Sequence, residues 1–203
     1  MAITVGHMLW MAMVLFLSLA IAVIRGGRLS NLGDIELRAW WLLVVAFALQ
    51  AATVWLPEAD WAEGLALAMV LTSFGLLMIL VILNREKKGM WLAGMGVLMN
   101  FTVIALNGGM PVLIGAAEVA SGFTVSVPDL SGSFKYVILD ESSRLTFLAD
   151  VIPLRLASIG EVISIGDVFL AVGLGRFLEH ELRRPRRLFK RGAHAQAGSA
   201  SNP

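Results

Sequence analysis

The chain has 203 residues and a formal net charge of +1; 58% of its residues are hydrophobic and only 15% are charged. A mean hydropathy of +0.79 lies well above that of soluble globular proteins, so composition predicts an integral membrane protein with no nucleic-acid partner. The sequence contains no cysteine, which excludes disulfides and thiolate metal sites.

Several apolar segments are close to the ~20 residues that an α-helix needs to cross a bilayer. In chain order they cover residues 7–24, 39–56, 65–84, 91–107 and 159–178. The fifth segment is the weakest, because Glu161 and Asp167 interrupt it. The pattern predicts an all-α polytopic membrane protein with about five transmembrane helices. Residues 1–191 are expected to form a single integral membrane domain, and the small, polar residues 192–203 a disordered tail.

Lys and Arg are distributed unevenly between the two ends of these segments. Thirteen of the sixteen lie in the loops after the first and third segments or in the carboxyl-terminal stretch. Because cytoplasmic loops are enriched in Lys and Arg, this bias predicts an outer amino terminus and a cytoplasmic carboxyl terminus in a bacterial cell membrane. Tryptophans near both ends of the segments fit the same frame, since Trp is enriched at membrane interfaces.

The stretch 112–158 is the sizeable extramembrane region, and this orientation places it on the outer face. Residues 123–127 alternate apolar and polar side chains, turn-forming residues follow, and 134–139 could return as a second strand. This predicts a short β-hairpin, although an irregular loop explains the same residues. A short helix over 141–148 is expected next.

Polar side chains fall in the outer halves of several predicted helices. Asp167 is the costliest of them, because an ionisable group at membrane depth costs roughly 2.5–3.5 kcal/mol on insertion scales. It is expected ~12 Å into the fifth segment, by helical rise. The shared depth predicts an outward-facing polar pocket around Asp167, lined by Gln50, Asn100, Asn107, Gly108, Gly109 and Ser164. For the neutral residues, hydrogen bonding between helices, at ~0.6 kcal/mol per contact, is the simpler alternative.

The run Asn107-Gly-Gly-Met-Pro111 follows the fourth segment. Glycine permits positive φ and proline blocks continuation of a helix, so a helix stop is the simplest interpretation. The functional alternative is that Asn107 points its amide into the pocket beside Asp167.

Three motifs resemble a family of small bacterial multipass membrane proteins classed only as a domain of unknown function. They are Asn107-Gly-Gly-Met-Pro111, Leu148-Ala-Asp-Val-Ile-Pro153 and Ser164-Ile-Gly-Asp167. The resemblance covers most of the chain and implies a membrane protein, but no activity.

A fainter resemblance, to the lipoprotein signal peptidases, is carried by Asp150 before Val151-Ile152 and by the run ending at Asp167. Those enzymes are intramembrane aspartyl peptidases, so the resemblance implies that Asp150 and Asp167 are catalytic and that the substrate is lipid-linked or a membrane helix. Ser164 and Gly166 depart from the family pattern, which has Asn and Ala there.

Two functions follow for the predicted pocket. Two carboxylates can hold one water between them, one as general base and the other as acid, which would make Asp150 and Asp167 an aspartyl hydrolase pair. The other function is binding of a lipid, an ion or a membrane partner, with Asp167 neutralised by Arg144 or Arg155. An oligomer or an accessory subunit of a larger complex is compatible with either. No histidine pair has metal-ligand spacing, so neither a metal nor another cofactor is predicted.

Overall fold

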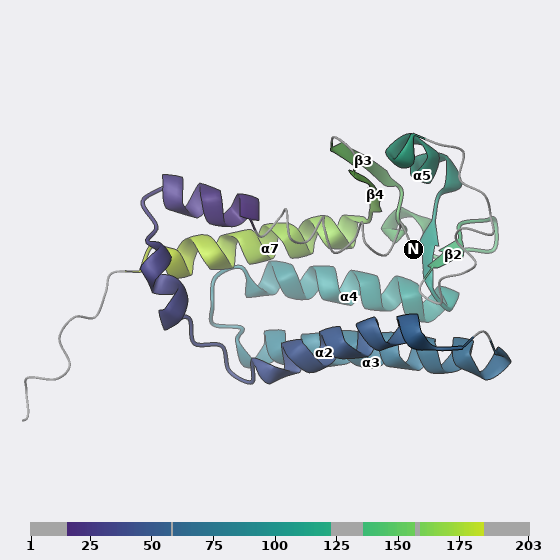
Figure 1. The fold of residues 1–203 in the computed structure, drawn as a ribbon, viewed down its shortest axis with the longest axis horizontal. Helices are drawn as coiled ribbons and strands as arrows, with labels where there is room; N and C mark the ends of the chain where they lie inside the picture. The colour runs from purple at the N-terminus through teal and green to yellow at the C-terminus, as the bar shows by residue number, and fades with distance from the viewer. Residues whose placement is uncertain (1–15, 58, 123–135, 157–158, 185–203) are drawn as a thin grey trace, which may run out of the picture.

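The computed structural model describes residues 16–57, 59–122, 136–156 and 159–184, and the fold is mostly helical (Figure 1). The long helices lie side by side in one bundle, and a helical segment over residues 16–24 lies beside the last of them. The helical elements of the bundle are η1 (Leu29–Asp34), α2 (Trp41–Ala52), η2 (Thr53–Trp55), α3 (Asp60–Leu83), α4 (Met90–Asn107) and α7 (Ile165–Leu182).

The helices α4 and α7 approach each other closely because glycine lies at their interface. A Cβ at Gly96 would overlap the carbonyl oxygen of Gly166, and a Cβ at Gly173 would overlap the backbone nitrogen of Ala93. Small residues spaced in this way let two helix backbones approach without intervening side chains, as in membrane helix pairs.

In the part of the chain that the structure describes, two helices, α3 and α4, are long and apolar enough to cross a membrane. At 1.5 Å rise per residue they span about 36 Å and about 27 Å, against a hydrocarbon core of ~30 Å. Large apolar side chains on the bundle remain exposed: Val44, Phe47, Leu65, Ile79, Ile82, Met95, Leu98 and Leu106. Exposed tryptophans mark both ends, with Trp40, Trp41 and Trp91 where α2 and α4 begin, and Trp55 and Trp61 where α2 ends and α3 begins.

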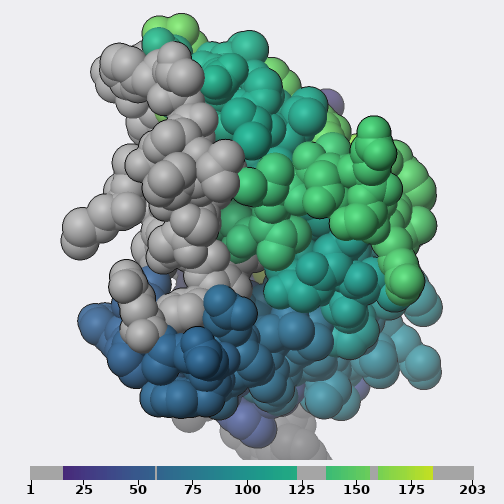
Figure 2. Space-filling model, turned by 90° about the vertical axis from the view of Figure 1, so that its right-hand side faces the viewer, coloured from purple at the N-terminus to yellow at the C-terminus, as the bar shows by residue number. Residues whose placement is uncertain are grey.

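A small cap covers the end of the bundle where α4 ends and α7 begins (Figure 1). Its elements are β1 (Met110–Val112), α5 (Ile114–Ser121), β2 (Tyr136–Ile138), η3 (Thr146–Leu148), β3 (Ile152–Leu156) and β4 (Ile159–Ile163). β1 and β2 pair in parallel, with Met110 opposite Tyr136, whereas β3 and β4 pair antiparallel, with Ile152 opposite Ile163. Figure 2 shows this end of the molecule, with the teal and green cap beside the blue end of α2 and α3.

One hydrophobic core joins the cap to the bundle. It contains Phe74 of α3 and Ile104 of α4 together with Met110, Tyr136 and Leu148 of the cap. The cap is therefore packed on the ends of the helices and shares their core, which fixes the position of its polar residues relative to α7.

The prediction for the fifth segment was wrong at its start. Residues 159–163 form β4, and α7 begins only at Ile165 and continues to Leu182. Asp167 is thus the third residue of a helix and not eight residues into one. The signal was present in the sequence, because Ser followed three residues later by an acidic residue before an apolar run marks a helix start.

One strand of the predicted outer hairpin is present, because Tyr136–Ile138 forms β2, which pairs in parallel with β1. The other predicted strand, 123–127, lies outside the described residues, so the hairpin stays a prediction. Among the described residues, β3 and β4 form an antiparallel hairpin. The short helix expected over 141–148 is reduced to one 3-10 turn, Thr146–Leu148.

The second and fourth predicted segments agree with α2–η2 and α4 to within two residues. The third begins five residues earlier than predicted, at Asp60, because the acidic loop residues Asp60 and Glu63 join the first turn of α3, where the helix dipole favours carboxylates. Of the first segment, residues 16–24 are helical; its remainder and the tail 192–203 lie outside the described residues.

Candidate functional site at the start of α7

The start of α7 is fixed by a reciprocal cap between Ser164 and Asp167. The Asp167 N–H donates to Ser164 Oγ at 3.0 Å, and the Ser164 N–H donates to Asp167 Oδ2 at 3.0 Å. This is a capping box, which satisfies backbone donors that a helix start leaves unpaired. Asp167 also gains from the helix dipole, because the amino-terminal end of a helix stabilises negative charge.

Asn100 of α4 forms hydrogen bonds with this capping box and so connects α4 to the start of α7. Its Nδ2 donates to Asp167 Oδ1 at 2.8 Å. The Ser164 hydroxyl lies 2.9 Å from Asp167 Oδ2 and 3.1 Å from Asn100 Oδ1, so its single proton goes to one of these oxygens at a time. A Cβ at Gly166 would overlap Asn100 Oδ1, which explains why glycine stands there. Both oxygens of Asp167 therefore accept hydrogen bonds from neutral donors.

The β3–β4 hairpin positions two further carboxylates beside this cap. Side chains alternate between the faces of a strand, so Glu161 and Ile163 share one face of β4, and both are buried. The opposite face carries Gly160, where a Cβ would overlap the carbonyl of Ala120 in α5. Asp150, only 1% exposed, precedes β3, and its N–H donates to the Pro111 carbonyl of β1 at 2.9 Å.

Tyr136 of β2 is close enough to these carboxylates for their charges to act on it. Burial raises the pKa of its phenol well above the ordinary value, and the negative charges of Asp150, Glu161 and Asp167, in that order, raise this pKa further. Three buried carboxylates thus act electrostatically on one buried phenol. We call Tyr136, Asp150, Glu161 and Asp167 the acidic cluster. Tyr136, Asp150 and Glu161 also have interactions within the chain, so none of them is free.

Among the residues predicted to line one pocket, the structure brings Asn100 and Ser164 to Asp167. Gln50 lies elsewhere: its Nε2 donates to Ser73 Oγ at 2.9 Å, which links α2 to α3. This contact is the interhelical hydrogen bond that the simpler alternative predicted.

Asn107 does not bond to Asp167, which corrects the prediction that its amide lies beside that carboxylate. Its Nδ2 donates to the Val103 and Arg144 carbonyls, and its Oδ1 accepts from the Arg144 N–H at 2.7 Å. Asn107 is seven residues beyond Asn100, about 10 Å further along α4. Gly108 caps this helix in the left-handed region at φ 75°, which confirms the helix stop, and Gly109 is buried directly after it.

The predicted neutralisation of Asp167 by Arg144 or Arg155 is not what the described residues form. The guanidinium of Arg155 lies against Gly122, and Arg144 meets Asn107 through its backbone. Within the described ranges no group of three acidic or histidine side chains is arranged to hold a metal ion. The cluster therefore offers concentrated negative charge and not a set of metal ligands.

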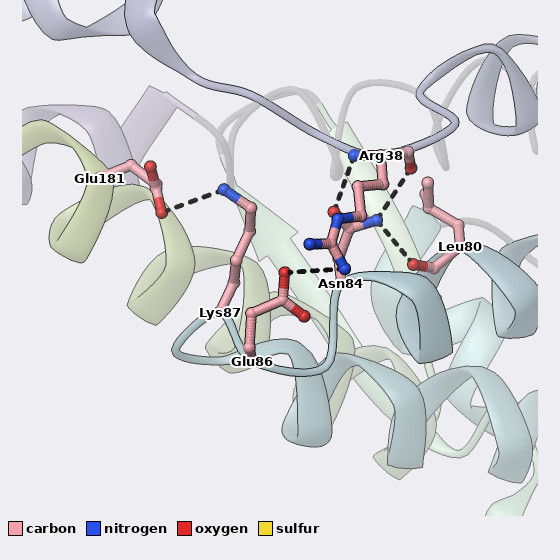
Figure 3. Close-up of polar contacts among 6 residues, drawn as sticks. All are labelled: Arg38, Leu80, Asn84, Glu86, Lys87 and Glu181. Carbon is pink, nitrogen blue, oxygen red and sulfur yellow. Dashed lines mark hydrogen bonds and ion pairs between the residues drawn. The ribbon is translucent and has the colours of Figure 1, made fainter.

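A second polar centre, at the opposite end of α7, was missed by sequence reasoning. Glu181 is 3% exposed, and its carboxylate lies 3.5 Å from Lys87 Nζ and 3.0 Å from Arg184 Nη1 (Figure 3 shows the pair with Lys87). Lys87 is also buried and stands 5.8 Å from the ring centre of Phe177, a cation–π contact. Lys87 and Glu181 are separated by 94 positions in the sequence, and neither lies in a motif that predicts an ion pair.

Neighbouring amides tie the same end of α7 and the α3–α4 turn to the loop before α2. Asn84 Nδ2 donates to the carbonyls of Arg38 and Leu80, and Asn84 Oδ1 accepts from the Arg38 N–H (Figure 3). Asn31 Nδ2 donates to the carbonyls of Leu182 and Arg184, which satisfies acceptors that the end of a helix leaves unpaired. We call Lys87, Glu181 and Arg184 the ion-pair junction.

Fold and site together define a mostly helical protein with membrane-length apolar helices and a small cap that holds a buried acidic cluster. The chain belongs to a family of unknown function, DUF5317, whose model matches residues 34–178. It is 30% identical over 161 residues to an uncharacterized protein of Thermotoga maritima, an alignment that covers 78% of this chain and 84% of that protein. No solved structure matches the chain. The matched region contains the acidic cluster and ends before Glu181.

Proposed function

We propose that this protein is a multipass protein of the bacterial cytoplasmic membrane that binds the ammonium group of a membrane lipid at the acidic cluster, on the outer face. The observation that carries the proposal is the burial of Asp150, Glu161 and Asp167 in one part of the molecule, where all three are close enough to act electrostatically on the buried phenol of Tyr136. In a medium of low dielectric, several carboxylates close together favour either protonation or a nearby positive charge.

The membrane part of the proposal rests on the exposed surface of the bundle. Apolar side chains on α2, α3 and α4 face outward between two levels of exposed tryptophan, which is the pattern of a lipid-facing belt with interfacial anchors. We propose that the bundle crosses the membrane about five times, with the cap outside. The concentration of Lys and Arg at the opposite end supports this orientation.

Orientation is testable because the chain has no cysteine. Glu141→Cys in the cap and Gly33→Cys in η1 both replace exposed residues at opposite ends of the bundle. In intact cells a membrane-impermeant maleimide should label position 141 and spare position 33, and permeabilised cells should label both. Labelling of position 33 alone in intact cells would reverse the orientation and place the acidic cluster in the cytoplasm.

An ammonium group suits the cluster better than a coordinated metal ion. The described carboxylates do not converge as metal ligands, whereas an ammonium needs only negative charge and hydrogen-bond acceptors within reach. Because the cluster already has interactions within the chain, the proposal depends on accumulated negative charge and not on unfilled hydrogen bonds. Exposed apolar side chains of the cap, such as Val119 of α5 and Phe147 of η3, favour a lipid as the molecule that carries the amine.

The test is ligand-dependent stabilisation of the purified protein in a neutral detergent, since a ligand that binds only the folded state raises its stability. Phosphatidylethanolamine should raise the unfolding midpoint more than phosphatidylcholine or phosphatidylglycerol does. Asp150→Asn and Glu161→Gln should remove that difference, while Glu141→Gln, which neutralises an exposed carboxylate of the cap, should keep it. Free ethanolamine is the soluble comparison.

Three results would count against this function. Equal stabilisation by the three lipids would remove the amine as the recognised group. If Asp150→Asn and Glu161→Gln both kept the full preference for phosphatidylethanolamine, the acidic cluster would not be the binding site. Stabilisation by free ethanolamine as strong as that by the lipid would make the ligand a soluble amine.

Aspartyl hydrolysis is the second candidate, and one observation favours it: Asp150 and Asp167 both act on the same phenol, so the two carboxylates occupy one buried region. In that mechanism one carboxylate would deprotonate a water and the other would protonate the leaving group. Asp150→Asn and Asp167→Asn would then each abolish cleavage of a lipid-linked or helical substrate at unchanged folded yield. The firm anchoring of both Asp167 oxygens by Asn100 and Ser164 makes us place binding first.

A further inference from the structure

A second charged surface lies at the ion-pair junction end, around His180 of α7. Lys88, Arg184 and Lys87 lie close enough to His180 to act on it electrostatically. Arg176 is four residues before His180, so the two side chains share one face of the helix. Positive charge thus collects from α7 and from the turn between α3 and α4.

Close packing brings Arg176 against the turn that contains Lys88. Gly89 has a left-handed backbone at φ 89°, and a Cβ there would overlap the Gly173 carbonyl and lie 3.1 Å from the Cβ of Arg176. Arg176 therefore leaves α7 directly beside the turn that carries Lys88. Glycine at position 89 permits both the turn and the approach.

The charges of this surface are only partly neutralised. Lys87 and Arg184 pair with Glu181, and Arg25 and Arg183 pair with Glu179. Lys88 and Arg176 are exposed, and neither forms an ion pair with another described residue. The surface consequently keeps an uncompensated positive charge where the turn meets α7.

We propose that Lys88 and Arg176, together with the partly exposed His180, bind the phosphate of an anionic phospholipid. The two cations lie beside the first turn of α4, where Trp91 is 70% exposed, and Trp40 and Trp41 are exposed at the same end of the bundle. Exposed tryptophans mark the level of lipid headgroups, and basic sites between membrane helices at this level suit anionic headgroups. A soluble phosphate compound has no acyl chains to pack against the exposed apolar side chains around the site, whereas a phospholipid does.

The experiment measures lipid retention by native mass spectrometry of the full chain, released from mixed micelles of phosphatidylglycerol and phosphatidylcholine. The wild-type protein should retain phosphatidylglycerol preferentially, and K88Q/R176Q should lower that preference about tenfold, since each basic residue near an anionic surface contributes several-fold. K88R/R176K, which preserves both charges, should keep most of it. The matched control R144Q/R155Q removes two exposed charges from the cap and should change the preference less than about twofold.

Three results would contradict this lipid site, and a fourth measurement distinguishes it from the acidic cluster. An undiminished preference in K88Q/R176Q, or an equal loss in R144Q/R155Q, would overturn the proposal. Displacement of the lipid by excess inorganic phosphate would show a site for soluble anions and overturn it as well. Glu161→Gln, which tests the outer site, should retain the preference for phosphatidylglycerol, so failure of one proposal does not decide the other.

Discussion

The two ends of α7 hold buried carboxylates by different means. At the start of the helix, Asp167 accepts hydrogen bonds from Asn100 and Ser164, which are both neutral, and from no cation among the described residues. In the last turn, Glu181 is held by the cations Lys87 and Arg184. The helix dipole explains the difference, because it favours negative charge at the amino-terminal end and opposes it at the carboxyl-terminal end. A carboxylate can therefore be kept with neutral partners at one end but needs positive charge at the other.

The largest effect is expected from Lys87→Met. The substitution leaves Glu181 buried against an unfavourable helix end with Arg184 as its remaining cation, and breaking a buried pair in this way costs about 3–5 kcal/mol. Unfolding by titration with a denaturing detergent measures the loss. Lys87→Met combined with Glu181→Gln should recover much of this loss. Lys88→Gln replaces an exposed neighbour that forms no ion pair with another described residue, and it should stay within about 0.5 kcal/mol of wild type. A Lys87→Met protein as stable as Lys88→Gln would show that the junction does not depend on this pair.

The next effect is expected from Gly166→Ala. The added Cβ overlaps Asn100 Oδ1, so the α4 side chain must move away from Asp167 or the helices must separate. Overpacking of this kind costs about 1–3 kcal/mol. Gly75→Ala in α3 is the control, because no atom lies within 4 Å of its added Cβ and a helix interior gains about 0.5–1 kcal/mol when Ala replaces Gly. If the two variants were equally stable, the start of α7 would not be packed closely against Asn100.

Ser164→Ala should cost less, about 1 kcal/mol, which is the usual effect of removing a helix N-cap. The Asp167 N–H loses its acceptor, while Asn100 keeps its hydrogen bond to Asp167 Oδ1. The same detergent titration measures this loss of stability. Amide hydrogen exchange should show faster opening confined to the first turn of α7. Faster exchange throughout the helix would mean that Ser164 holds more than this turn.

The smallest effect concerns the pKa of Tyr136, the single tyrosine of the sequence, so its ionisation can be followed by tyrosinate absorbance. Asp150→Asn should lower this pKa most, Glu161→Gln less and Asp167→Asn least, although burial keeps it raised in every variant. Since the folded pKa exceeds the unfolded value of about 10, the folded state holds its proton longer than the unfolded state does. Stability contributed by Tyr136 is thus complete below about pH 10 and is lost as pH rises toward the folded pKa. A different order among the variants would contradict the arrangement of the acidic cluster.

Some residues of the candidate site could be identified from the sequence pattern, whereas others could be identified only from contacts in the folded protein. Asp167 could be singled out because an acidic residue among apolar ones is costly. Its partner Asn100 lies 67 positions away, and only the close approach of α4 and α7 brings the two together. Glu161 was treated as an interruption of a helix, although it belongs to a strand whose alternation buries it. Gln50 and Asn107 were assigned to one pocket by depth alone, and depth does not specify which face of a helix a side chain occupies.

The sequence by itself determined the mostly helical fold, the membrane-length apolar helices, the approximate bounds of α2, α3 and α4, and the helix stop at Asn107, because length, hydropathy and glycine chemistry are local properties. It also contained the start of α7 in the spacing of Ser164 and Asp167. Only the tertiary structure decided that β1 pairs with β2 in parallel, that three carboxylates come close enough to Tyr136 to act on it electrostatically, and that Lys87 meets Glu181. Each of these depends on contacts between segments far apart in the chain, whose partners are chosen by the packing of the shared core and not by any local pattern.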